Sequence, residues 1–275
     1  MLGSMIGDIV GSIYEFDNIR TKDFPLFSNK MSYTDDSILT IATADWLLNG
    51  GNIADYYLKY ALSEPLPMGS YGPMFLEWIS RAKEGKMKPY GSCGNGSAMR
   101  VGPVGWIAKT EEEAMTLAKL SAECTHNHKE GIKGAQAVAL AIYMARKGKN
   151  KDEIKRAIAS NFNYDLSMSV SELNKRYSWY GVDNKGNGGT CQDSVPQAIT
   201  CALEAQSFED AVRNAISIGG DSDTIGCICG SIAEPLYGIP NDIYEIAYSY
   251  LPKRYQVIID KFEAEYGSGR KENNK

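Results

Sequence analysis

Long apolar runs are missing from this sequence. Gly, Asp, Lys or Glu interrupts every apolar stretch well before the ~18 uncharged residues that would indicate a membrane span. The first eight residues, MLGSMIGD, carry no basic region and reach an Asp before an apolar signal core could form. These features argue against a membrane protein and against secretion, and a cytoplasmic location is expected.

The sequence also has no excess of positive charge and no C-x-x-C pair of cysteines. The 275 residues contain 29 Lys and Arg against 34 Asp and Glu, a formal net charge of −5, so no overall positive field is available to gather a polyanion. Nucleic-acid binding is therefore not expected as the main role. The six cysteines never form a C-x-x-C pair, which argues against both a disulfide framework and a structural zinc site.

Helical periodicity is what the chain does have, over most of its length. Apolar spacing and capping residues predict about ten helices, among them helices over residues 36–49, 52–62, 73–83, 110–123, 129–147, 242–250 and 253–266. No convincing alternating strand is present. The expected fold is all-α, a compact single-domain multi-helix bundle over residues 1–266. Residues 163–192 lack the periodicity and are expected to form a surface insertion or lid, and residues 267–275 a polar C-terminal tail.

Two short acidic segments stand at predicted helix starts, about 185 residues apart. Each offers two carboxylates beside a threonine hydroxyl, an all-oxygen set that suits hard cations such as Mg²⁺, Mn²⁺ or Ca²⁺. Together they could hold two ions, with the predicted ligands Thr34, Asp35, Asp36, Asp221, Asp223 and Thr224. The alternative is helix capping, which Asp, Ser and Thr favour, although one cap needs only one oxygen.

A glycine-rich run and both histidines form two further candidate binding elements. Residues 90–103 carry glycines at 91, 94 and 96, whose backbone N–H groups could converge on a phosphate or pyrophosphate. The run is neither a Walker loop nor G-x-G-x-x-G, and a plain turn between helices is the alternative. His126 and His128 do not share a helix face, so a paired zinc site is not expected. One of them is expected either to contact a ligand or to cap the following helix.

The N-terminal segment combines glycines with two carboxylates. Gly3, Gly7 and Gly11 predict close approach to another backbone, since glycine in a helix costs about 1 kcal/mol relative to alanine. In a continued helix, Asp8, Gly11 and Glu15 would lie along one face. The pair Gly226 and Gly230 predicts the same close approach for a second helix.

These blocks together resemble the ADP-ribosylglycohydrolase family. The resemblance runs end to end, and its five blocks appear in the family's order: G-D-x-x-G-x-x-x-E at 7–15, T-D-D at 34–36, G-N-G-x-x-M-R at 94–100, T-H at 125–126 before G-A at 134–135, and G-G-D-x-D-T at 219–224. It implies an all-α bundle around a central cleft with a dinuclear Mg²⁺ or Mn²⁺ site, Mg²⁺ being expected first. The activity implied is hydrolysis of the bond between the anomeric carbon of ADP-ribose and an acceptor side chain.

The resemblance also implies roles for individual residues. Glu15 and Asp36 are the expected acid/base participants, and the metal ions would hold the vicinal hydroxyls of the distal ribose. The backbone of residues 91–97 and His126 would take the pyrophosphate, and Tyr90 or Met87 would lie against adenine. The expected substrate-binding residues are Tyr90, Ser92, Gly94, Asn95, Gly96, Met99 and His126.

Substrate identity stays open at this point. Some arginine-directed members of the family carry an acidic residue just ahead of the G-N-G block, where this chain has Ser92-Cys93, so the acceptor is unassigned. An ADP-ribosylated protein or a small ADP-ribosyl conjugate is the expected partner, and the chain is expected to act as a monomer. Two alternatives are a non-catalytic binder of ADP-ribose-type ligands and a dinuclear-metal nucleotide or phosphodiester hydrolase.

Overall fold

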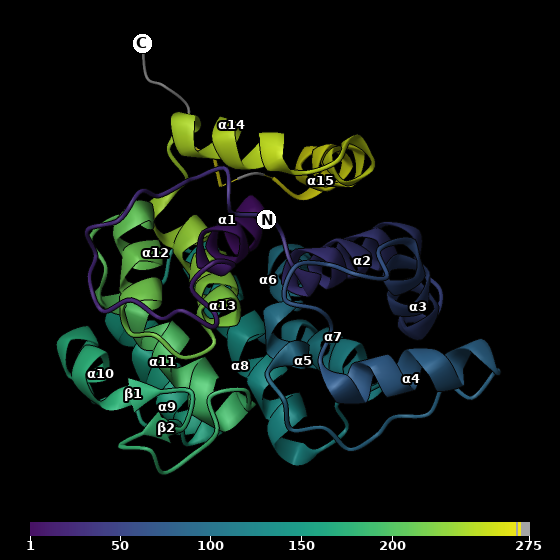
Figure 1. Ribbon diagram of the computed structural model, residues 1–275, viewed down its shortest axis with the longest axis horizontal. Helices are drawn as coiled ribbons and strands as arrows, with labels where there is room; N and C mark the ends of the chain where they lie inside the picture. Colours follow the sequence, from purple (N-terminus) through teal and green to yellow (C-terminus); the bar gives the residue numbers. More distant parts are fainter. Residues whose placement is uncertain (268, 271–275) are drawn as a thin grey trace.

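The computed structural model describes residues 1–267, 269 and 270, and its architecture is all-α, as expected (Figure 1). The described residues form fifteen helices and one two-stranded antiparallel hairpin. The helices are α1 Leu2–Gly11, α2 Asp35–Asn49, α3 Ile53–Ser63, α4 Pro73–Lys83, α5 Gly96–Met99, α6 Gly102–Ile107, α7 Glu111–Glu123, α8 Lys129–Arg146, α9 Lys151–Phe162, α10 Val170–Arg176, α11 Cys191–Glu204, α12 Phe208–Ser217, α13 Ser222–Tyr237, α14 Asn241–Tyr250 and α15 Lys253–Tyr266, and the strands are β1 Tyr177–Ser178 and β2 Gly181–Val182. None of the described helices is both long enough and apolar enough to cross a membrane.

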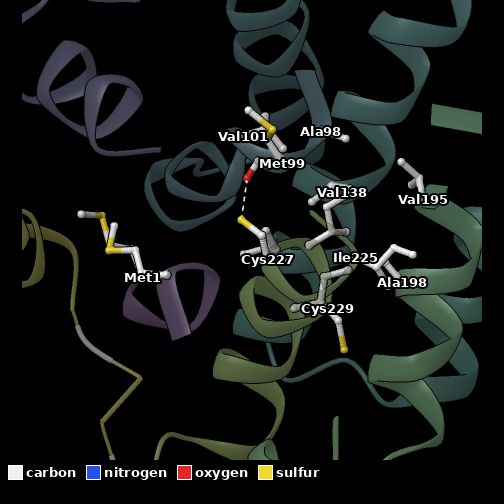
Figure 2. Close-up of a cluster of buried hydrophobic side chains, with 14 of the residues drawn as sticks. Met1, Ala98, Met99, Val101, Val138, Val195, Ala198, Ile225, Cys227 and Cys229 are labelled. Atoms are coloured by element: carbon white, nitrogen blue, oxygen red, sulfur yellow. Dashed lines mark hydrogen bonds between the residues drawn. The ribbon is translucent and has the colours of Figure 1, made fainter. Parts of the chain in front are cut away.

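Helix α13 is the central element of the bundle. It lies beside α1 and also contacts α8, α11 and α12, while α14 and α15 lie together at one end of the molecule (Figure 1). Every residue of α13 from Ser222 to Glu234 is buried, which fits a helix surrounded by other helices. Figure 2 shows its Ile225, Cys227 and Cys229 among apolar side chains of neighbouring elements, and the Cys227 thiol donates to the Met99 carbonyl at 3.3 Å.

The glycines of α1 and α13 bring these two helices into direct backbone contact. A Cβ added at Gly7 would lie 1.9 Å from the Gly226 carbonyl oxygen, and one added at Gly230 would lie 2.1 Å from the Gly3 carbonyl oxygen. No side chain fits in that space, so the glycines permit the close approach that their spacing predicts. The consequence for the site is that the start of α13 lies against the end of α1.

Several helix boundaries differ from the expectation. Helix α2 begins at Asp35, one residue before the predicted start, and its N-cap is Thr34, whose hydroxyl accepts from the Asp36 backbone N–H at 3.2 Å. Helix α1 ends at Gly11, so Glu15 does not continue its face but lies in the turn that follows. That turn is held by the Asn18 side chain, which donates to the Tyr14 and Glu15 carbonyls at 2.6 and 3.1 Å. These local hydrogen bonds replace the helical ones that the periodicity favours.

The region predicted as an aperiodic insertion has some structure of its own. Residues 163–192 contain α10 and the β1–β2 hairpin, neither of which the sequence pattern predicts. The short helices α5 and α6 were not expected either, because four to six residues are too few to show a period. Of the predicted tail, residue 268 and residues 271–275 lie outside the described residues, and Gly269 accepts from the Ile239 N–H at 2.7 Å.

Candidate active site

A cleft of about 430 Å³ collects nearly all of the residues that the sequence singles out. It is bounded by the starts of α2 and α13, the turn after α1, the segments 69–75 and 90–100, and single residues of two further loops. The predicted residues that line it are Glu15, Asp35, Asp36, Tyr90, Ser92, Gly94, Asn95, Gly96, Met99, His126, Asp221, Asp223 and Thr224. Thr34 does not line the cleft.

The start of α2 is fixed by a carboxylate that the cleft does not expose. Asp8 is fully buried and accepts from the Thr34 N–H at 3.0 Å, the Thr34 hydroxyl at 2.7 Å, the Ser37 N–H at 3.1 Å and the Ser37 hydroxyl. Its two oxygens are therefore occupied by the residues that flank Asp35 and Asp36. Asp8 thus sets the position of this acidic pair. The Thr34 hydroxyl donates to Asp8 and accepts the cap hydrogen bond from the Asp36 N–H.

The start of α13 supplies the second acidic pair, which does no capping. Asp221 occupies the N-cap position but forms no cap hydrogen bond, and its Oδ2 accepts from the Asn95 amide at 2.7 Å. Thr224 donates to Asp36 Oδ2 at 3.2 Å, which joins the two helix starts directly. Asp36 Oδ1 and Asp223 Oδ1 are buried and have no hydrogen-bond partner. Capping therefore does not account for these carboxylates.

Glu15 enters the same cluster from the turn after α1. Its carboxylate and those of Asp221 and Asp223 offer oxygen atoms that all lie within 4.8 Å of one another. Its Oε2 also faces Gly69, where an added Cβ would lie 2.8 Å away. The Glu15 carbonyl accepts from the Trp179 indole N–H at 2.8 Å, so the segment 163–192 holds this turn from outside.

Crowding of carboxylates in a buried place makes their ionisation unfavourable. Burial, and then the charges of Asp223, Asp35 and Asp8, raise the pKa of Glu15 to about 9. Burial raises the pKa of Asp221 to about 6, and burial with neighbouring carboxylates raises the pKa values of Asp35, Asp36 and Asp223 well above their usual range. A bound cation would reverse this penalty, because it favours the ionised forms.

The donor set fits one or more hard divalent cations. It contains only carboxylate and hydroxyl oxygens, and two of the carboxylate oxygens are buried with no protein partner. The ion pairs of the described residues, such as Lys59–Asp45 and Lys22–Asp210, lie elsewhere, so no Lys or Arg of the described part neutralises the cluster by direct contact. Asp and Glu are seldom fully buried without such a partner or a metal.

The glycine-rich turn, His126 and Tyr90 also line the cleft, and the turn contacts the acidic cluster through Asn95. The rings of Tyr90 and His126 are 5.7 Å apart, whereas Met87 does not line the cleft. His128 is exposed and caps α8 by accepting from the Glu130 N–H, which confirms the capping alternative for this histidine, whereas His126 lines the cleft. The Gly94 and Asn95 N–H groups are already bonded to Ser92 Oγ and the Gly189 carbonyl, so the backbone N–H groups converge on the cleft only in part.

Sequence reasoning missed several contributors to the site, including Phe16, Leu39 and Gly189. The segment 69–75 and Trp179 line the cleft, and Arg100 is fully buried at its floor with its guanidinium 3.9 Å from the centre of the Tyr57 ring. Asp8 was recognised as part of a motif but not as the residue that orients α2. The Gly69 and Gly72 pair beside Ser70 and Tyr71 was a usable sign of a turn near a site, whereas Trp179 has no local pattern that would have revealed it.

The fold agrees with what comparison with known proteins shows. The sequence model of the ADP-ribosylglycohydrolase family matches residues 1–265. The chain therefore belongs to the ADP-ribosylglycohydrolase family, and hydrolysis of ADP-ribosyl groups is the class of activity that this membership indicates.

Two relatives and one solved structure illustrate the relationship. The chain is 24% identical to ADP-ribosylhydrolase ARH3 of Mus musculus, over 96% of this chain and 87% of that protein. It is also 24% identical to ADP-ribosylarginine hydrolase Tri1 of Pseudomonas putida, over 95% of this chain and 77% of that protein. A solved ADP-ribosylglycohydrolase-related protein complex superposes with a TM-score of 0.67 at 22% identity, covering 96% of this chain and 92% of that one, which shows the fold.

Proposed function

We propose that this protein is a metal-dependent hydrolase that cleaves the glycosidic bond between ADP-ribose and an acceptor, most simply a modified protein side chain. The observation that carries the proposal is that Asp35, Asp36, Asp221 and Asp223 line one cleft together with Glu15, Tyr90, His126 and the glycine-rich turn. The carboxylates suit cations and proton transfer, and the remaining residues offer hydrogen-bond donors and an aromatic face.

The cations are proposed to be two, with Mg²⁺ preferred over Mn²⁺. Asp35, Asp36, Asp221, Asp223 and Thr224 would hold them, with the two unpartnered carboxylate oxygens as the first candidates for ligands. When bound, they would supply positive charge beside the sugar hydroxyls and the anomeric centre. Thr34 is placed behind the cluster by its bonds to Asp8, so we assign it the role of positioning Asp36.

The chain's own groups account for binding and for proton movement. The His126 Nε2 and the backbone N–H groups at residues 96 and 97 are proposed to donate to the pyrophosphate, and the Tyr90 ring to lie against adenine. Glu15, whose pKa is raised to about 9 in the metal-free protein, is proposed to deliver a proton to the departing acceptor atom. Asp36 is proposed to accept the proton of the attacking water.

The reaction conserves all atoms without any further reactant. The bond between the anomeric carbon and the acceptor breaks, the water oxygen bonds to that carbon, and the acceptor atom gains a proton. The products are free ADP-ribose and the unmodified acceptor. The alternatives from the sequence give other results, since a nucleotide hydrolase would release AMP and a binding protein would release nothing.

The test is incubation with proteins that are ADP-ribosylated separately on Arg, Ser and Glu, with Mg²⁺ or with a chelator, followed by chromatography of the nucleotide products. We expect ADP-ribose from at least one acceptor type and only in the presence of metal. The Asp36→Asn protein is the matched control for contaminating activity. Release of AMP, or no release from any acceptor, would refute the proposal.

A further inference from the structure

His126 presents an unpaired nitrogen to the cleft. The residue is only 6% exposed, yet it lines the cleft, and its Nε2 lies against the glycine-rich turn, 3.1 Å from the position that a Cβ on Gly96 would take. The other ring nitrogen, Nδ1, lies 2.8 Å from the Thr125 hydroxyl. Within the described part of the chain, Nε2 has no hydrogen-bond partner, so its function depends on whether it carries a proton.

The hydroxyl of Thr125 is oriented by a group that can only donate. Arg100 is fully buried, and its Nη2 donates to Thr125 Oγ1 at 2.7 Å and to the Ser121 carbonyl at 3.1 Å. A guanidinium has no acceptor, so the Thr125 oxygen must accept this bond. The hydroxyl proton of Thr125 is then free for a different partner.

Four acceptors lie near that hydroxyl proton, among them the Cys124 sulfur, and the His126 Nδ1 is closer than the Ala122 carbonyl. Nδ1 is 2.8 Å away, whereas the Ala122 carbonyl is 3.4 Å away, near the limit of a hydrogen bond. The Tyr90 hydroxyl also lies beside Thr125. Burial and the Arg100 charge both lower the pKa of His126, which keeps the ring neutral, with a single proton on one nitrogen.

We propose that Arg100 and Thr125 act as positioning residues that fix the His126 imidazole with its proton on Nε2, as a hydrogen-bond donor toward a ligand oxygen in the cleft. The order of donation is Arg100 Nη2 to Thr125 Oγ1, Thr125 hydroxyl to His126 Nδ1, and His126 Nε2 to the ligand. The identity of the ligand rests on the proposed function. The assignment of the proton to Nε2 does not depend on that function.

The first test is nitrogen-15 NMR of the imidazoles in the ligand-free protein at neutral pH. The chain has only two histidines, and His128 is exposed, so the His128→Gln protein assigns the remaining signal to His126. We expect Nδ1 at the chemical shift of an unprotonated nitrogen and Nε2 at that of a protonated one. A protonated Nδ1 would overturn the proposal.

The second test compares two replacements of Thr125. Thr125→Ser keeps the hydroxyl and should leave the imidazole signals unchanged, whereas Thr125→Val keeps the shape and should move the Nδ1 signal, because its hydrogen bond is lost. Identical signals in the Val and wild-type proteins would overturn the role of Thr125. If the Val variant does not fold, Thr125→Ala removes the hydroxyl without adding a methyl branch and takes its place in the same comparison.

The third test measures ADP-ribose affinity by calorimetry in a double-mutant cycle. Thr125→Val should weaken binding about threefold to tenfold, the effect of one misdirected hydrogen bond, and Thr125→Ser should not. In a His126→Ala background the Val replacement should add nothing, because Thr125 acts only through the ring. An equal loss in both backgrounds would overturn the proposal. Failure of the wild-type protein to bind ADP-ribose, with the Nε2 proton in place, would instead count against the proposed function.

Discussion

Glu15→Gln should make the metal-free protein more stable, and the gain should grow with pH. The pKa of this carboxyl is about 9 in the folded protein against an ordinary value of 4.5. Between these values the unfolded chain loses the Glu15 proton while the folded protein keeps it, so the free energy of unfolding falls as pH rises. Glutamine does not ionise, so the free energy of unfolding of the variant has no pH dependence from this position. The effects of Asp35, Asp36 and Asp223 are common to both proteins and largely cancel in the comparison.

The size of the effect can be bounded from the structure. At pH 8 the pKa difference corresponds to at most about 5 kcal/mol, at 1.36 kcal/mol per unit. Because Glu15 is only partly buried, water screens much of the repulsion, and we expect a gain of about 1–2 kcal/mol at pH 8 and almost none at pH 5.

Urea unfolding followed by circular dichroism in EDTA, at several pH values from 5 to 8.5, measures this difference. Saturating Mg²⁺ should reduce or reverse the gain, because a cation stabilises the ionised carboxylate that glutamine lacks. A Gln variant that is less stable than wild type at pH 8 in EDTA, or a difference that does not change with pH, would refute the reasoning.

Five further outcomes are expected. The Glu15→Gln protein should bind Mn²⁺ and ADP-ribose with affinities within about tenfold of wild type, a difference of ~1.4 kcal/mol. Its turnover should fall about 10²- to 10⁴-fold. Loss of metal affinity in isothermal titration calorimetry would show instead that Glu15 is a metal ligand. Asp221→Asn should abolish turnover while the fold survives by circular dichroism, since the amide oxygen can still accept from Asn95. Millimolar Mg²⁺ or Mn²⁺ should raise the melting temperature of the wild-type protein, and calorimetry should show AMP binding much more weakly than ADP-ribose. Gly7→Ala should destabilise by about 3 kcal/mol or more in urea unfolding, because its Cβ meets the Gly226 carbonyl. Gly72→Ala has open space around it and should cost only about 0.5–1 kcal/mol, the loss of glycine at the N-cap of α4.

Much of the fold follows from local signals in the sequence. Pro73 at the start of α4, the capping box of Asn150 and Glu153 on α9, and the cap of Ser207 on α12 all act within one helical turn, and each is where its residue type predicts it. The glycine spacing of α1 and α13 likewise predicted a close helix contact.

The rest depends on contacts between distant segments. Trp179 reaches Glu15 across 164 residues, and Arg100 meets Thr125 on another element, so neither partnership leaves a trace in the neighbouring sequence. The sequence pattern predicts Glu15 on a continued helix, whereas it lies in a turn. Hydrogen bonds from the Asn18 side chain hold this turn, and the spacing of apolar residues gives no sign of such bonds. The residue types at the cleft were predictable, whereas the hydrogen bonds that orient them were not.

The backbone contact between α1 and α13 also has a consequence for how the protein is made. Helix α1 leaves the ribosome about two hundred residues before α13, the helix against which it packs. Asp8 and Glu15 are likewise synthesised about two hundred residues before Asp221 and Asp223. Until then the glycine face of α1 has no partner, and a helix of ten residues is marginal by itself in water. The cleft therefore forms late in synthesis, and a chain released before residue 221 would contain Asp35 and Asp36 but lack Asp221 and Asp223. Closure over so long a stretch of sequence favours slow folding for a helical protein.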